Sequence, residues 1–279
     1  MFKGAVDGDG GMAYDEAMIG FLVKKTFFDL WDNMFRAALI NLGFIASLAI
    51  LVFLPGLFTS IPVLSLLITL TGTLWCFVYL AAAALSLRAV SDYGSFGFGD
   101  FIRNLKAGWP AGLLLGLLFF GVRAMISVVI PFYLGMNSLI GLLLAAVIFW
   151  TLAVACLALQ FFFAIRTRLD TKLSKVFKKC FIIFFDNPGF CIFSFIYNVI
   201  GLGISVFLAF LFPGPAGILL YLDEALRLRL LKYDWLEAHP PAEGENARRR
   251  KIPWDALLID DRERTGTRSL RNFIFPWKD

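Results

Sequence analysis

Four long stretches of the sequence contain no charged residue, and this constrains the fold more than any other feature. The stretches are residues 37–87, 107–122, 124–165 and 187–222. A helix that crosses a bilayer needs about 20 apolar residues, because each residue adds about 1.5 Å against a hydrocarbon core of about 30 Å. Hydrophobic residues make up 59% of the 279 residues and charged residues only 17%. This composition excludes a soluble enzyme or a soluble nucleic-acid binder and indicates an integral membrane protein.

Proline and glycine residues divide these stretches into six predicted transmembrane helices. The helices cover about residues 37–56, 62–87, 110–133, 137–165, 188–211 and 214–230. A stretch rich in aromatic residues precedes each pair of spans and is predicted to be an amphipathic elbow helix. The three stretches are residues 27–39, 98–110 and 175–190. The expected fold is an all-α polytopic membrane protein with six transmembrane helices as three hairpins, each preceded by an amphipathic cytoplasmic elbow.

The distribution of positive charge predicts the orientation of these hairpins. The predicted tips, at residues 55–62, 131–137 and 212–217, contain no lysine or arginine, whereas basic residues gather at the opposite ends. Loops rich in lysine and arginine remain in the cytoplasm. We therefore expect a multi-pass protein of a bacterial cytoplasmic (inner) membrane with both termini in the cytoplasm. The net charge of +5 is explained by these clusters, so no nucleic-acid partner is predicted.

Three segments of different composition are expected. Residues 1–23 form a polar N-terminal segment, residues 24–232 the transmembrane domain, and residues 233–279 a cytoplasmic tail. The tail carries large apolar groups, which either fold back onto the bundle or the headgroup zone or dock to a partner protein. These groups are Trp254, Phe273, Phe275 and Trp277.

Arg123 interrupts the third predicted span and is the most unusual residue of the apolar region. An intramembrane arginine costs about 2.5–3.5 kcal/mol, so it should find a carboxylate or a wet cavity. Counting from the third tip places Asp223 and Glu224 at a similar depth on the sixth span. One prediction is an ion pair between helices from Arg123 to Asp223 or Glu224. In the alternative, Arg123 reaches outward to the interface while the two carboxylates pair locally with Arg227.

A basic stretch lies between the second and third hairpins. Its lysines and arginines are candidate contacts for anionic lipid headgroups, and orientation by positive charge alone is the favoured interpretation. The residues are Arg166, Arg168, Lys172, Lys175, Lys178 and Lys179.

No set of residues supports catalysis or cofactor binding. Residues Gly97, Phe98, Gly99 and Asp100 match the Gly-x-Gly-Asp signature of intramembrane aspartyl proteases, but Asp100 lies in a charged loop, where a helix cap is the favoured interpretation. The chain has one histidine, and its four cysteines lack the spacing of a zinc site. We therefore expect no cofactor, no metal and no enzymatic activity.

Two motifs carry a resemblance to a known family. The first hairpin contains SLAILVFLPGLFTSIP, and the second elbow reads FGFGDFIRNLKAGWPAGLLLG, with Phe98, Phe101 and Asn104 in a Phe-x-x-Phe-x-x-Asn pattern. Over residues 25–232 the chain resembles the YesL-like family of bacterial membrane proteins of unknown function. The resemblance implies a small inner-membrane protein that accompanies carbohydrate uptake systems and has no assigned catalytic residues.

The sequence therefore favours a non-enzymatic scaffold or accessory subunit of a membrane transport system, with the lipid bilayer and a membrane protein as partners. The second hypothesis is a small-solute transporter or channel with a polar path at Arg123 and Asp223/Glu224. An intramembrane aspartyl protease is the third.

Overall fold

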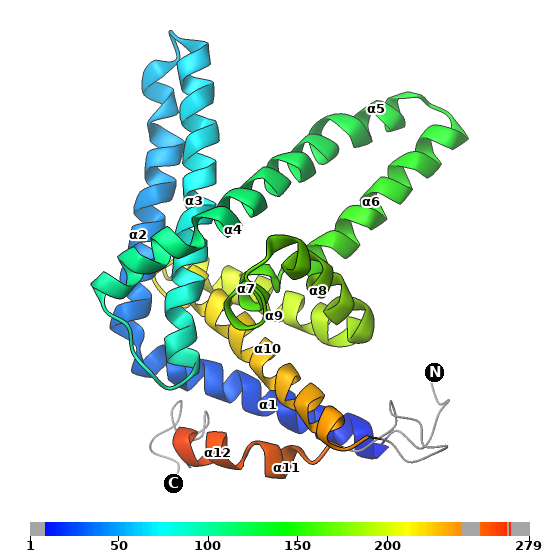
Figure 1. Cartoon of the computed structure of the whole chain (residues 1–279). Coiled ribbons are helices and arrows are strands. Elements are labelled where there is room, and N and C mark those ends of the chain that lie inside the picture. Colours follow the sequence, from blue (N-terminus) through cyan, green and yellow to red (C-terminus); the bar gives the residue numbers. More distant parts are fainter. Residues whose placement is uncertain (1–8, 241–251, 267, 269–279) are drawn as a thin grey trace. The chain divides into compact units, whose positions relative to one another are not determined.

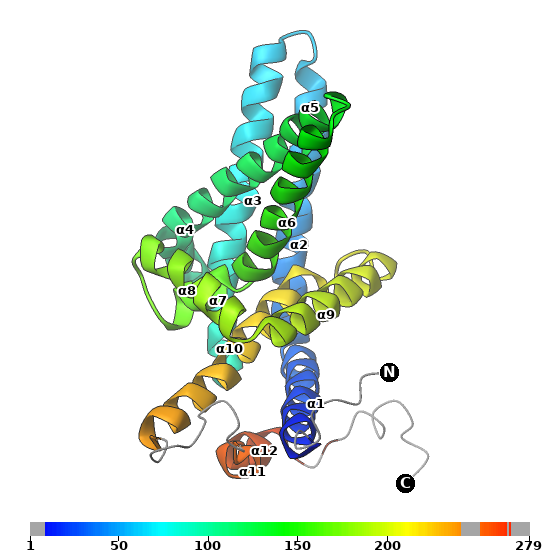
Figure 2. The same ribbon diagram turned by 90° about the vertical axis from the view of Figure 1, so that its right-hand side faces the viewer.

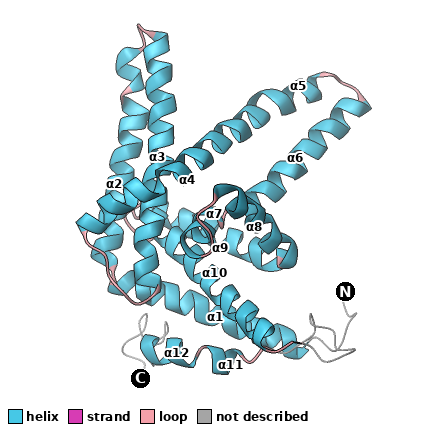
Figure 3. Ribbon diagram, viewed as in Figure 1, coloured by secondary structure: helices cyan, strands magenta, loops and turns pink. Residues whose placement is uncertain are grey.

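The structure, a computed structural model, describes residues 9–240, 252–266 and 268. Every regular element in these residues is a helix, and Figure 3 shows no strand among them. The elements, in chain order, are α1 (Asp9–Asp32), α2 (Met34–Phe53), the short helix η1 (Pro55–Phe58), α3 (Pro62–Ser91), α4 (Phe98–Ala124), the π-helical η2 (Met125–Val129), α5 (Ile130–Gly135), α6 (Leu139–Leu159), α7 (Phe162–Arg168), α8 (Leu173–Asp186), α9 (Pro188–Phe207), α10 (Gly214–Ala238), α11 (Trp254–Leu257) and α12 (Ile259–Thr265).

Two compact units share the chain. One unit holds residues 33–223, and the other holds residues 1–32 together with residues 224–279. The division falls inside α10, between Asp223 and Glu224. The units therefore divide the chain at other positions than the three segments expected from composition.

Five helical segments are long and apolar enough to cross a membrane, so the chain is a multi-pass membrane protein. These segments are Met34–Phe58, Pro62–Ser91, Phe98–Gly135, Leu139–Arg168 and Pro188–Phe207. The predicted sixth span, residues 214–230, is not among them. Its helix, α10, has only nine uncharged residues, from Gly214 to Leu222, before Asp223, and nine residues cover only about 14 Å.

The three predicted elbow helices differ in how far the structure forms them as separate helices. The first expected elbow is divided at Asn33, where α1 ends and α2 begins. The second does not separate from its span, because α4 continues through Pro110 as one helix. The third is a distinct helix, α8, which buries one face and ends at Asn187, before α9 begins at Pro188.

Within the unit of residues 33–223, two long hairpins diverge towards their tips (Figure 1). The first consists of α2, η1 and α3, and the second consists of α4, η2, α5 and α6. Glycines allow α3 and α4 to pack closely near the base, since a Cβ atom at Gly112 would lie 2.4 Å from the Cα of Val78. The three glycines of this face recur every fourth residue, as in close-packed transmembrane helix pairs. They are Gly108, Gly112 and Gly116.

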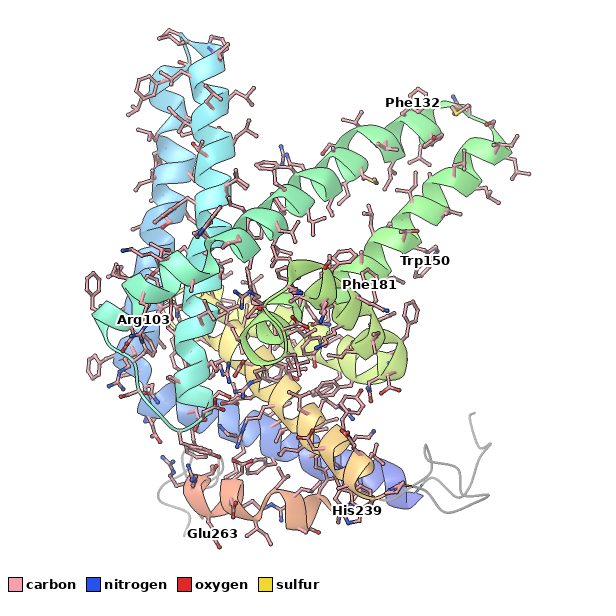
Figure 4. All side chains as sticks on the ribbon, viewed as in Figure 1. Arg103, Phe132, Trp150, Phe181, His239 and Glu263 are labelled. Carbon is pink, nitrogen blue, oxygen red and sulfur yellow. The ribbon has the colours of Figure 1, made fainter. Side chains whose placement is uncertain are left out.

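The distribution of exposed apolar groups fits a lipid environment. Large apolar side chains of the hairpins are exposed, including Phe132 at 66% and Trp150 at 67%, both of which project from the second hairpin (Figure 4). The buried side chains instead gather at the base, among them Phe161, Ile165 and Leu220. Exposed apolar surface of this extent is unfavourable in water and matches hydrocarbon, where the hairpins would lie.

Candidate functional site

Asp223 was a predicted partner of Arg123, but in the structure Asp223 pairs with a different arginine. Arg123 is exposed on α4, whereas Asp223 is buried and forms an ion pair with Arg168. The prediction placed Asp223 deep in a full-length sixth span, but the short apolar part of α10 brings it to the charged end of the unit. For the alternative, in which Arg227 pairs locally with the two carboxylates, the structure gives an ion pair between Arg227 and Asp261 of α12 at 2.9 Å.

Arg168 is the centre of the polar cluster in this unit. Its guanidinium group donates to the Oγ of Ser91 at 2.8 Å, to the carboxylate of Asp92 at 2.9 Å and to the carboxylate of Asp223. The Thr167 hydroxyl also donates to Asp223, at 3.1 Å. The Arg168 side chain is only 9% exposed. The cluster therefore joins the end of α3, the end of α7 and the middle of α10, and the Arg168 charge is paired with two carboxylates there.

A second polar cluster lies in the other unit, where α1 meets the second part of α10. The ammonium group of Lys25 donates to Glu224 at 3.2 Å and to Asp29. The Thr26 hydroxyl donates to the second oxygen of Glu224. The side chains of Lys25 and Glu224 are both 0% exposed. One lysine thus faces two carboxylates in a place that excludes water.

The described part of the tail packs against α1 in the same unit. Trp254 and Leu258 are buried. The guanidinium group of Arg268 binds both carboxylate oxygens of Asp32, at 2.9–3.0 Å, and lies 4.6 Å from the ring centre of Phe28. Residues 252–266 and 268 of the tail therefore fold back onto α1 of the same chain. Phe273, Phe275 and Trp277 lie outside the described residues.

Burial controls the protonation of Glu224. The loss of hydration raises the pKa of Glu224 from 4.5 to about 8, and the nearby Asp29 carboxylate adds to the increase. Lys25 and the Thr26 hydroxyl act in the opposite direction, but Lys25 is shared with Asp29. The folded protein therefore retains the Glu224 proton over a pH range in which the unfolded chain releases it.

This pKa gives a testable pH dependence of stability. The contribution of Glu224 is fully present below about pH 4.5 and is lost as the pH rises through about 8, because the proton is bound more tightly in the folded state. Thermal unfolding of the detergent-solubilised protein, followed by circular dichroism between pH 5 and 9, should show a midpoint that falls more steeply with pH in the wild type than in Glu224→Gln. Parallel curves for the two proteins would contradict this assignment.

The six basic residues between the second and third hairpins have different environments. Arg168 is buried in the cluster with Asp223 and is not available to lipid. Arg166 is partly buried, whereas Lys172, Lys175 and Lys178 are exposed. Lys175 and Lys179 lie 4.0 and 3.5 Å from Asp170. The backbone N–H of Lys172 and these two lysines lower the pKa of Asp170, so its charge partly offsets theirs. The exposed lysines remain candidates for headgroup contact.

Asp100 caps a helix. Its carboxylate accepts the backbone N–H of Gly97 at 2.9 Å and pairs with Arg103 at 2.6 Å at the start of α4. This geometry satisfies an N–H group that a helix start leaves unpaired, and it accounts for the acidic residue without catalysis.

Sequence reasoning gave no role to Asn41, which holds the turn between α9 and α10. The Asn41 side chain is fully buried, and its amide donates to the carbonyl oxygens of Leu211 and Pro213, both at 2.9 Å. Its oxygen accepts the N–H of Ala216 at 2.8 Å. Gly214 sits against this amide with φ +58°, and a Cβ there would lie 2.4 Å from the Asn41 nitrogen. A single asparagine within an apolar run was the available signal.

The described residues contain no group of three or more His, Cys, Asp or Glu side chains that could hold a metal ion. Comparison with known proteins gave no relatives: no family model, no curated protein and no solved structure matches the chain. The geometry of the buried polar clusters is therefore the basis for a functional proposal.

Proposed function

We propose that this chain is a non-enzymatic integral protein of a bacterial cytoplasmic membrane, and that it serves as a scaffold or accessory subunit of a transport system. The observation that carries the proposal is that the buried acidic side chains of α10 are paired with basic side chains of other helices. Asp223 is held by Arg168, and Glu224 is held by Lys25, so both carboxylates serve to join helices. Side chains engaged in this way hold helices of the chain together and are not available to line a solute path.

The two ends of the chain support the proposed orientation. α1 ends at Asp32, next to the start of α2, and it contacts the tail through Lys24 and Gly266 and through Asp32 and Arg268. Segments that contact each other lie on the same side of a bilayer. The positive charge at the ends of the hairpins favours the cytoplasm for that side. The resemblance to the YesL-like family adds the proposed association with carbohydrate uptake.

Purification of the tagged full-length protein in native lipid discs tests this function. We expect a membrane protein to copurify at a fixed stoichiometry that an unrelated multi-pass protein with the same tag does not reach. Proteoliposomes that contain the purified chain alone should show no solute flux. Recovery of a solitary protein that carries flux would contradict the accessory role.

The second candidate, a small-solute carrier, has one observation in its favour. The side-chain oxygens of Gln160 and Asn198 are buried and have no hydrogen-bond partner in the described part of the chain. Both residues belong to apolar segments, where an unpaired amide oxygen is costly unless a water or a solute binds to it. Flux that disappears in Asn198→Leu and persists in Asn104→Leu would favour this carrier.

A further inference from the structure

The third hairpin consists of α9 and α10, and its turn lies next to Asn41 of α2. The position of Asn41 along α2 therefore gives the distance of this turn from the charged end of the first hairpin. Asn41 lies seven residues after Met34, the first residue of α2, which corresponds to about 10 Å along the helix. Twelve more residues, or about 18 Å, continue from Asn41 to Phe53. Because Asn41 binds Leu211, Pro213 and Ala216 directly, the turn lies in the inner part of the first hairpin, far from its tip.

α10 provides an independent measure of the same depth. Asp223 is tied through Arg168 to Asp92, which directly follows the last residue of α3 at the charged end of the first hairpin. Gly214 begins α10 nine residues before Asp223, so the turn lies about 14 Å from the charged end. The two measures, about 10 and about 14 Å, agree, and both fall well short of a hydrocarbon core of about 30 Å.

The direction of α9 agrees with a shallow turn. α9 has 20 residues and is therefore about 30 Å long. A helix of this length that ends at a depth of about 10–14 Å has to lie strongly tilted. Figure 2 shows α9 running across the direction of α2 and α3.

The contacts of the turn explain how irregular backbone is tolerated at this depth. Non-helical backbone in a membrane must be satisfied by protein or water. Asn41 satisfies two carbonyl oxygens and one N–H group, and the Oγ of Ser205 accepts the N–H of Gly214 at 2.9 Å. Asn41 and Ser205 are themselves buried. Side chains of the same unit thus satisfy four backbone groups of the turn.

We propose that α9 and the first part of α10 form a re-entrant hairpin, which enters the membrane from the cytoplasmic side, turns at Asn41 and returns to the same side. Four helical segments then cross the membrane, namely Met34–Phe58, Pro62–Ser91, Phe98–Gly135 and Leu139–Arg168. This number is even, as required when the two ends of the chain contact each other. The inference rests on the proposed membrane orientation.

Labelling of single cysteines tests this topology. In the full-length chain with its four native cysteines replaced, Thr59→Cys and Met136→Cys mark the first two tips, and Leu211→Cys marks the third turn. Met136 and Leu211 are similarly exposed, at 51% and 43%, so burial by the protein does not distinguish them. A maleimide that cannot cross membranes is added to spheroplasts, and the same samples are labelled again after denaturation in SDS as a control for reactivity.

We expect Thr59→Cys and Met136→Cys to react from outside, and Leu211→Cys to react at least about tenfold more slowly until the protein is denatured. Equal labelling of all three positions would overturn the re-entrant hairpin while leaving the proposed orientation intact. Lack of external labelling at Thr59→Cys and Met136→Cys would refute the orientation itself, and the re-entrant hairpin would be refuted with it.

Discussion

Replacement of Lys25 by methionine is expected to lower the free energy of unfolding by about 3–5 kcal/mol, the range for breaking a buried ion pair by removing one partner. The substitution retains the length of the side chain but removes the positive charge that faces both Asp29 and Glu224. The Asp29 carboxylate then remains without its cation, next to the protonated Glu224, in a site without water. The measurement is reversible unfolding in mixed micelles of detergent and SDS, followed by circular dichroism.

Lys24→Met is the matched control for Lys25→Met. Lys24 is the neighbouring residue, but it is only partly buried and donates to one carbonyl oxygen, that of Gly266, at 3.2 Å. Its replacement should cost about 1 kcal/mol. The double variant Lys25→Met/Asp29→Leu should recover much of the loss, since it removes the buried Lys25–Asp29 charge pair as a whole and apolar replacement of a whole buried pair is often neutral. Equal losses for the two lysine variants, without recovery in the double variant, would contradict the ion pair.

Asn41→Leu is expected to lower the free energy of unfolding by about 3–5 kcal/mol. Leucine has nearly the same volume but leaves two carbonyl oxygens and one N–H group of the turn without their partner, and each unsatisfied buried group costs about 1–3 kcal/mol. The affected groups belong to Leu211, Pro213 and Ala216. The same SDS titration measures the effect.

Asn104→Leu provides the comparison for this variant, since the Asn104 amide makes one hydrogen bond, to the Oγ of Ser86 at 3.0 Å. Its loss should be roughly a third of that for Asn41→Leu. If both asparagines cost the same, the turn does not depend on Asn41. Slower digestion of the third turn by added protease in Asn41→Leu than in the wild type would also contradict the assignment, because a released turn should become more accessible.

The first two hairpins could be predicted from the sequence because their boundaries are set by charge. Residues 37–87 contain no charged residue and lie between Arg36 and Arg88, and residues 107–165 contain only Arg123 and lie between Lys106 and Arg166. The corresponding helices in the structure are long enough to cross a membrane. The helical class and the membrane location follow from this pattern alone.

The third hairpin could not be predicted in the same way, because packing on Asn41 sets its depth. The sequence shows only an apolar run from residue 187 to 222 with prolines in its second half, which is compatible with two full spans. The depth of Asp223 was then counted from the third tip, as if the tip reached the outer surface. That assumption led to Arg123 as the predicted ion-pair partner of Asp223, whereas the partner in the structure is Arg168.

The second polar cluster shows a different limit. Lys25 and Glu224 are 199 residues apart, and neither residue stands within a local pattern that identifies the other. The spacing of Lys25 and Asp29 at four residues was visible but is common on solvated helix surfaces. Only the fold brings Glu224 to them. The three glycines at every fourth residue of α4, in contrast, were a readable local signal for close packing against α3.

The separation of Lys25 from Glu224 also bears on biosynthesis. The ribosome must add 199 further residues after Lys25 before Glu224, the more distant of its two acidic partners, exists, which takes about 10–40 s at ordinary rates of translation. During that time α1 has left the ribosome while the hairpins insert one after another. Closure of the unit that joins the two ends is therefore a late step, and a nascent chain that terminates before residue 224 cannot make it.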